Sequence, residues 1–323
     1  MTQAAPWQLE ILGLRSARGD YCWLDLAAPP EWQSRPGQFV NIRCDDAADA
    51  TVSGQEIPWT GDGLPDAPHG RHLHGPSPLV RRPISISRLI DDGDGSRRLV
   101  LLVRVVGSGS QLLSNRKAGD RLDVIGPLGN GFDLGGPARR AVLVGGGCGI
   151  APLVGLADAL AASGRSVTVF YGERSADRVP LPLPESARPT GDGVVALRGT
   201  PQLPEADLIL ATEDGSLGFK GRVTDAMAAW GASCGWDDAE LFACGPDVMM
   251  AAVAALARVR GIERCQVSLE NYMGCAIGVC LSCAVKIRAD NAQGWTYKLV
   301  CQDGPVFEAG DVIFENKWEG CKK

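Results

Sequence analysis

The chain has 323 residues, of which 45% are hydrophobic and 22% charged, and this composition is typical of about two globular domains rather than of a disordered chain. Its 32 Lys and Arg against 38 Asp and Glu give a net charge of −6, which argues against nucleic acid as a partner because phosphate binding needs a basic surplus. The sequence shows no signal peptide and no membrane span, so we expect a cytoplasmic protein.

Residues 1–137 predict a small antiparallel β-barrel. Short runs of β-branched and aromatic residues alternate with Gly, Pro and Asp, as strands alternate with turns. The expected strands are 7–14, 21–26, 39–43, 84–87 and 99–106, with one helix at 111–116. Residues 45–79 interrupt this pattern with a long segment rich in Gly, Pro and Asp, which we interpret as a surface insertion.

Residues 138–263 predict a doubly wound parallel sheet, because strands and helices alternate there. The expected strands are 141–144, 167–171, 208–211 and 240–243, and the expected helices are 150–162, 223–230 and 248–259. Residues 264–323 form a short cysteine-rich tail, which we expect to be a third, small domain.

Two segments of the first domain have the character of a cofactor site. Residues 81–87 read Arg-Arg-Pro-Ile-Ser-Ile-Ser, and we expect Arg82 on a phosphate and Ser85 on a ring nitrogen of a flat cofactor. An edge strand with a polar face is the alternative. Residues 107–110 form a Gly-Ser turn that opens a helix, which is suited to a phosphate.

Two glycine turns of the second domain follow predicted strands. Residues 145–149 read Gly-Gly-Gly-Cys-Gly and open a helix, whose amides and dipole favour a pyrophosphate. Cys244-Gly245-Pro246 follows another strand at the same sheet edge, where ligands of such folds bind. Either turn alone could be only a tight connection, but two of them favour a dinucleotide site.

The tail carries the most specific motif of the chain. Cys275, Cys280 and Cys283 are spaced C-x4-C-x2-C, and Cys301 follows at a distance. This is the spacing of plant-type [2Fe-2S] ferredoxins, whereas structural zinc sites favour two short cysteine pairs. We therefore predict a [2Fe-2S] cluster and keep a zinc site as the alternative.

The order of these motifs resembles the ferredoxin–NADP⁺ reductase superfamily, and more closely the electron-transfer subunits of class 1B dihydroorotate dehydrogenases. The resemblance covers the whole chain except the insertion and includes the signature Gly-Pro-Leu-Gly-Asn-Gly-Phe at 126–132 and Val-Cys-Gln-Asp-Gly-Pro-Val-Phe at 300–307. It implies that FAD is bound by Arg82, Pro83, Ile84, Ser85, Ile86, Gly107, Gly109 and Ser110, where Ser110 replaces a threonine. It implies that NAD is bound by Gly145, Gly146, Gly147, Gly149, Cys244, Gly245 and Pro246.

The resemblance also implies a function and a partner. A catalytic subunit that contains FMN would oxidise dihydroorotate, and electrons would pass through the [2Fe-2S] cluster and FAD of this chain to NAD⁺. The flavin stands between the one-electron cluster and the two-electron nicotinamide, and no residue of this chain has to act as a general base. Two alternatives share the cofactors: the small subunit of an NADH-dependent ferredoxin:NADP⁺ oxidoreductase, or that of a sulfide dehydrogenase. A zinc-binding interaction module is the alternative of another class.

The choice between NAD and NADP depends on residues that follow two strands of the second domain. Glu213 and Asp214 would repel a 2′-phosphate and favour NAD, whereas Arg174 would favour NADP. We expect NAD. By position, the segments 171–174 and 212–216 could line the nicotinamide or the adenosine ribose.

Overall fold

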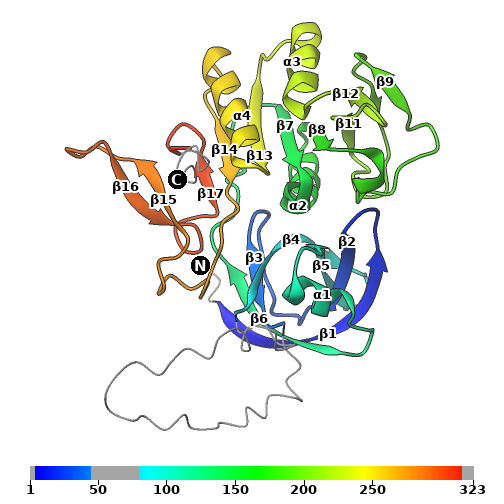
Figure 1. Cartoon of the computed structure of the whole chain (residues 1–323), viewed down its shortest axis with the longest axis vertical. Helices are drawn as coiled ribbons and strands as arrows, with labels where there is room; N and C mark the ends of the chain where they lie inside the picture. The colour runs from blue at the N-terminus through cyan, green and yellow to red at the C-terminus, as the bar shows by residue number, and fades with distance from the viewer. Residues whose placement is uncertain (1–3, 45–79, 315–323) are drawn as a thin grey trace, which may run out of the picture.

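The computed structural model describes residues 4–44 and 80–314, which form a closed barrel, a large sheet covered by helices, and a two-stranded hairpin (Figure 1). This arrangement confirms the predicted fold class. The predicted insertion at 45–79 lies outside the described residues.

Six antiparallel strands from residues 5–42 and 82–128 close the barrel in the order β1-β2-β5-β4-β3-β6, with β6 returning to pair with β1. They are β1 (Ala5–Ser16), β2 (Tyr21–Ala27), β3 (Phe39–Ile42), β4 (Arg82–Asp91), β5 (Arg97–Arg104) and β6 (Arg121–Leu128), and helix α1 (Ser108–Ser114) follows β5. The sequence predicts all of these strands except β6, whose apolar pattern is interrupted by Gly126 and Pro127. Helix α1 begins at Ser108 rather than at the predicted residue 111, because the Gly-Ser turn is itself its first turn.

Within residues 140–308, nine strands form the large sheet in the order β17-β14-β13-β7-β8-β11-β12-β9, with β10 paired to β11. The strands are β7 (Arg140–Gly146), β8 (Ser166–Glu173), β9 (Pro189–Gly191), β10 (Ala196–Leu197), β11 (Ala206–Thr212), β12 (Gly218–Lys220), β13 (Ala239–Cys244), β14 (Cys265–Ser268) and β17 (Val306–Glu308). The central pairs are parallel, and β17 adds an antiparallel edge. Strands β14 and β17, which come after the predicted domain division at residue 263, extend this same sheet.

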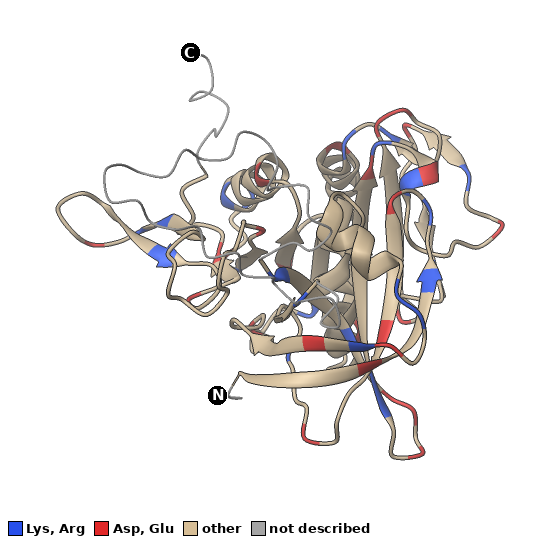
Figure 2. Cartoon of the chain, turned by 60° about the horizontal axis from the view of Figure 1, so that its bottom comes forward, with Lys and Arg blue, Asp and Glu red and all other residues tan. Residues whose placement is uncertain are grey.

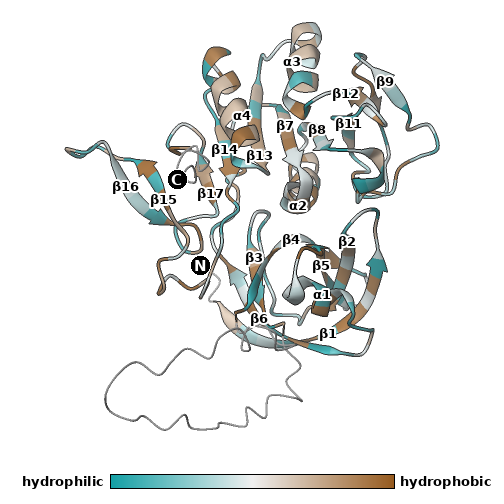
Figure 3. Ribbon diagram, viewed as in Figure 1, coloured by the Kyte–Doolittle hydropathy of each residue, from teal (hydrophilic) through white to brown (hydrophobic). Residues whose placement is uncertain are grey.

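Helices cover both faces of the sheet, which is therefore doubly wound as predicted. Helix α2 (Ile150–Ala162) packs on one face, and α3 (Val223–Cys234) and α4 (Asp247–Val259) pack on the other. Side chains alternate along β7, so that Leu143 joins the core under α2 while Val142 and Val144 join the core under α3 and α4. The hydrophobic colour of the central strands β7 and β13 in Figure 3 follows from this burial on both faces.

The cysteine-rich tail contains the hairpin of β15 (Ala284–Arg288) and β16 (Trp295–Leu299), in which Ala284 pairs with Leu299. Asn130, which follows β6, ties this tail to the barrel. Its side chain donates to the carbonyls of Asp303 (2.9 Å) and Val306 (3.0 Å) and accepts from the amide of Val306 (3.0 Å). The signature segment at 126–132 thus also holds the cysteine-rich tail.

The barrel and the sheet meet where β4 packs against α2. A side chain on Gly155 of α2 would lie 2.4 Å from the carbonyl of Ser87, so only glycine allows this approach. Arg88 pairs with Asp158 one turn further along the helix.

Acidic and basic residues are interleaved over the barrel and the sheet in the view of Figure 2. None of the described helices is long and apolar enough to cross a membrane.

Candidate functional site

The four predicted cluster ligands lie close together in the tail. Cys275 and Cys280 belong to the loop between β14 and β15, and Cys283 directly precedes β15. Cys301 follows β16, and the hairpin brings it beside Cys283, whose carbonyl accepts a hydrogen bond from Val300 (3.1 Å). Cys283 and Cys301 are buried, whereas Cys280 is exposed. The hairpin therefore supplies the proximity that the spacing alone does not explain.

Backbone amides converge on the sulfur atoms of this loop. The Sγ of Cys275 accepts from the amides of Ile277 (3.5 Å), Val279 (3.3 Å) and Cys280 (3.3 Å). The Sγ of Cys280 accepts from the amide of Cys275 (3.3 Å) and lies 3.1 Å from the hydroxyl of Ser282. Such donors stabilise a thiolate, which is the form that binds iron.

The surroundings of the cysteines shift the pKa values of two thiols, Cys280 and Cys301, in opposite directions. The hydrogen bond from Ser282, together with backbone donors, lowers the pKa of Cys280 to about 6. Burial, with the neighbouring thiol of Cys283, raises the pKa of Cys301 to about 12. A bound metal cation favours the thiolate and so opposes this effect of burial.

The backbone of the loop that carries Cys275 and Cys280 is strained, as expected for a loop that curls tightly around its ligand. Ala276 and Leu281 both have a φ of 59°, in the left-handed region that side chains disfavour. Gly278 has a φ of 83°, and a side chain there would lie 2.2 Å from Oε1 of Gln302. Strain of about 1–3 kcal/mol per such residue is typical of ligand-binding loops.

The donor set fits a [2Fe-2S] cluster. The sulfur contacts join the cysteines in two pairs, Cys275 with Cys280 and Cys283 with Cys301. A [2Fe-2S] cluster takes four thiolates on two irons, so each pair could hold one iron. The paired contacts favour two irons over one zinc.

The two predicted nucleotide turns lie against each other at the carboxyl ends of β7 and β13. Cys244 is in register with Gly145 in the parallel pair. A side chain on Gly149 would lie 1.9 Å from the carbonyl oxygen of Cys244, and one on Gly245 would lie 2.9 Å from the carbonyl of Gly146. Helix α2 begins at Ile150, so its free amides open into this junction. The turns form one glycine-lined surface suited to a pyrophosphate.

The two predicted flavin segments also meet. The side chain of Arg82, on β4, crosses Gly109 of the Gly-Ser turn, where a side chain would lie 3.0 Å from Nε of Arg82. The hydroxyl of Ser110 accepts from the amides of Val106 (2.9 Å) and Gly107 (3.1 Å). This hydroxyl is therefore engaged in closing the turn, and the amides beyond it are the groups left for a phosphate.

The buried carboxylate of Glu173, in a segment predicted to line the nicotinamide or the adenosine ribose, links the barrel to the nucleotide turn. Glu173, at the end of β8, accepts a hydrogen bond from the hydroxyl of Tyr21 on β2 (2.7 Å), and its side chain is 6% exposed. The hydroxyl of Tyr171 donates to the carbonyl of Gly147 (3.2 Å). Tyr21 and Glu173 are 152 residues apart, and no motif spacing could have paired them.

Three further polar residues lie near this link, and two of them, Arg104 and Glu270, belong to no motif that could have indicated them from the sequence. Arg104, at the end of β5, lies 5.7 Å from the centre of the Tyr21 ring, and its Nε has no hydrogen-bond partner among the described residues. Burial raises the pKa of Cys148 to about 12, so its thiol stays protonated. Glu270, just after β14, is an exposed residue whose carboxyl lies near enough to Cys148 and Arg104 to interact with them electrostatically.

The residues expected to choose the nucleotide lie on adjacent turns. The amide of Asp214 donates to the carbonyl of Arg174 (3.2 Å), which joins the turns after β11 and β8. The carboxylate of Asp214 accepts from the amide (2.9 Å) and hydroxyl (2.6 Å) of Ser216, which lowers its pKa. The charge of Asp214 is thus fixed in the turn.

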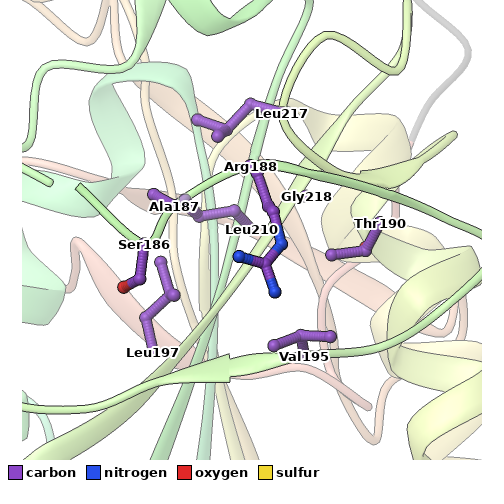
Figure 4. A pocket seen from close by; sticks show the side chains of 9 residues that line it. All are labelled: Ser186, Ala187, Arg188, Thr190, Val195, Leu197, Leu210, Leu217 and Gly218. Carbon is purple, nitrogen blue, oxygen red and sulfur yellow. The ribbon is translucent and has the colours of Figure 1, made fainter. Parts of the chain in front are cut away.

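A small pocket lies beside this turn, between β9, β10, β11 and β12. Figure 4 shows Arg188 entering it among Leu197, Leu210 and Val195. None of the residues predicted to bind a cofactor lines this pocket.

Comparisons with known proteins agree with the geometry. Residues 270–313 match the family model for the iron-sulfur cluster binding domain of dihydroorotate dehydrogenase B, and residues 143–255 match the oxidoreductase NAD-binding domain. Among solved structures, a chain of the NADH-dependent reduced ferredoxin-NADP oxidoreductase has a TM-score of 0.67 at 28% identity, over 97% of this chain and 92% of that chain. A ferredoxin NADP⁺ reductase from Neisseria gonorrhoeae with bound FAD and NADP shares the fold over 80% of this chain and 93% of that chain, with a TM-score of 0.55 at 12% identity.

Curated relatives are similar over nearly the whole chain. The dihydroorotate dehydrogenase B (NAD(+)) electron transfer subunit of Desulforamulus reducens is 36% identical over 87% of this chain and 87% of its own length. The subunit of the same name from Geobacillus thermodenitrificans is 36% identical over the same shares. The chain therefore belongs to the family of electron transfer subunits of dihydroorotate dehydrogenase B, and it is an oxidoreductase subunit.

Proposed function

We propose that this chain carries electrons from a dihydroorotate-oxidising subunit to NAD⁺ in pyrimidine biosynthesis. The observation that carries the proposal is the position of β4, which holds the flavin motif. One neighbouring strand, β3, contacts the cluster loop through the hydrogen bond between Asn41 and Cys275, and β4 itself packs against α2, which opens at the nucleotide turns. The three candidate sites thus follow one another in the order cluster, flavin, nicotinamide.

The chemistry in this proposal comes from the cofactors, and the protein positions them. A flavin accepts electrons one at a time from an iron-sulfur cluster and gives a pair, with a proton, to NAD⁺ as hydride. In this assignment the cysteine pairs hold the cluster, Arg82 and the amides after Gly107 hold the FAD phosphates, and the glycine turns hold the dinucleotide. In this reaction no residue of this chain has to remove a proton from a carbon atom of the substrate.

The partner in this proposal is a catalytic subunit that contains FMN, in a hetero-oligomer. Four apolar side chains of the cluster loop, Tyr272, Ile277, Val279 and Leu281, are exposed, with Tyr272 at 93% and Val279 at 75%. We call them the cluster-loop patch. Exposed apolar patches mark interaction sites, and Ile277, Val279 and Leu281 are close in sequence to Cys280, which is itself exposed. A partner that covers the patch would bring its own redox centre next to the cluster.

We further propose NAD as the nucleotide and the cytoplasm as the location. The carboxylate of Asp214, fixed in the turn after β11, would repel a 2′-phosphate. Among the described residues no two cysteines form a disulfide, as is usual in a reducing compartment.

Anaerobic titration of the purified chain with NADH tests the proposal. We expect bound flavin and acid-labile sulfide, with bleaching of both cofactors by NADH. Dihydroorotate should reduce them only when the FMN subunit is present. A colourless protein that contains zinc would contradict the proposal.

The similarity to the NADH-dependent reduced ferredoxin-NADP oxidoreductase supports a second candidate, in which another partner receives the electrons. Measuring the binding of the dihydroorotate-oxidising subunit distinguishes the two candidate functions. Val279→Asn should weaken binding to the dihydroorotate-oxidising subunit by about tenfold or more, as for the loss of a central contact. Val259→Asn, at an equally exposed valine of α4 (77%), is the matched control and should leave binding unchanged. Transfer to ferredoxin without binding of that subunit would favour the second candidate.

A further inference from the structure

Strand β3 forms the wall between the barrel and the cluster loop. Val40 and Ile42 are fully buried in the barrel core. Phe39 belongs instead to the core that contains Cys283 and Cys301. Because side chains alternate along a strand, Asn41 shares the outward face of Phe39. A polar side chain thus lies on the face that β3 turns toward the cluster ligands.

Asn41 contacts a cluster ligand directly. Its Nδ2 donates to the carbonyl oxygen of Cys275 at 3.3 Å, across 234 residues of sequence. On the barrel side, Asn41 pairs with Pro83 of the flavin motif, and its own carbonyl accepts from Nη1 of Arg81 at 3.4 Å. One residue therefore connects the strand of the flavin motif with the loop of the cluster.

The amide of Asn41 is retained at an energetic cost. The residue is 0% exposed, and its Oδ1 has no hydrogen-bond partner among the described residues. A buried acceptor without a donor is destabilising, whereas a leucine of nearly the same shape would avoid that cost. Packing alone does not explain an asparagine here, but a contact with a cluster ligand does.

We propose that Asn41 is a positioning residue for electron transfer between the flavin and the cluster. Its hydrogen bond fixes the backbone of Cys275 against the barrel wall, so that the thiolate of this residue would be held in place when it binds iron. In each transfer one electron leaves one cofactor and arrives at the other, and Asn41 is neither oxidised nor reduced. The inference rests on the proposed function, because it requires both cofactors in this chain.

The experiment compares the unmodified chain with Asn41→Leu, each loaded with flavin and cluster. NADH should bleach the flavin of both proteins at the same rate. In the variant, the following reduction of the cluster should be slower by about tenfold or more, as is typical when a group that hydrogen-bonds a metal ligand is lost. The cluster should also show a shifted electron paramagnetic resonance spectrum and faster loss of iron to a chelator. If Asn41→Leu does not fold, Asn41→Ser, which is polar but too short to reach Cys275, should give the same changes.

Asn291→Ala is the matched control. Asn291 also donates its side-chain amide to a backbone carbonyl of the tail, that of Trp295 at 2.9 Å, but at the exposed end of the hairpin. It should leave the spectrum and both rates unchanged. Unchanged spectra, iron loss and cluster reduction in the Asn41 variants would overturn the inference, and so would an equal slowing of flavin and cluster. If the unmodified chain itself holds no cluster or flavin, the proposed function fails instead.

Discussion

Gly149→Ala tests whether the two glycine turns hold the nicotinamide nucleotide. The added methyl group would lie 1.9 Å from the carbonyl oxygen of Cys244, 2.3 Å from its carbon and 2.7 Å from the amide nitrogen of Gly245. Side-chain carbons essentially never approach closer than 3.0 Å, so the turns must separate by about 1 Å. A shift of that size at a reacting pair lowers the rate by about 100-fold, while overpacking destabilises the fold by about 1–3 kcal/mol.

Anaerobic stopped-flow reduction of the bound flavin by NADH measures this effect. Gly149→Ala should lower kcat/KM for NADH by about 100-fold, while electrons supplied by dithionite reduce flavin and cluster as in the unmodified chain. Gly13→Ala is the control, because a side chain there meets nothing within 4 Å. If NADH reduces the flavin of Gly149→Ala within about threefold of the unmodified rate, the nucleotide does not bind at the turns.

Two further predictions concern a buried ion pair and the cluster loop. Glu240→Gln leaves Arg165, whose Nη2 lies 2.7 Å from the carboxylate, without its charge partner inside the protein, and chemical denaturation should show a loss of about 3–5 kcal/mol. Asp207→Asn, which removes a surface ion pair, should cost less than about 1 kcal/mol, and equal losses would contradict the reasoning. Ser282→Ala in the iron-free chain should raise the pKa of Cys280 from about 6 toward 9.0, because its thiolate loses a donor. Site-resolved alkylation should then begin at higher pH, and an unchanged pH profile would refute the assignment.

The sequence predicts those parts of the fold that depend on local pattern. The buried runs that became β7, β8, β11 and β13 have the length and composition of parallel strands, and the helices between them are strongly apolar. The cluster motif is equally local, since C-x4-C-x2-C places three ligands on one loop. Strand β6 is not predicted because Gly126 and Pro127 are residues typical of turns. In the barrel, β6 nevertheless pairs with β1 and β3.

Contacts between distant segments could not be predicted from the sequence. Tyr21 looks like one more aromatic of a strand, and nothing in its surroundings indicates a hydrogen bond to Glu173. Asn41 lies between two apolar residues of a strand, and its only signal is a polar side chain in a buried run. Such pairs form only after the barrel, the sheet and the tail have taken their relative positions.

The features that select a reaction for this chain differ from those that hold its cofactors. The cysteine pairs, the glycine turns and β4 suit any subunit that moves electrons between nicotinamide, flavin and cluster. The chain is accordingly similar both to electron transfer subunits of dihydroorotate dehydrogenase B and to a chain of the NADH-dependent reduced ferredoxin-NADP oxidoreductase. The cluster-loop patch is under no such constraint, because none of its four side chains is needed to hold iron. Its exposed apolar groups are suited to burial against a complementary surface of a partner. We therefore expect the choice of electron donor to depend on the cluster-loop patch, and exchanging its side chains between family members should transfer partner specificity without disturbing either cofactor.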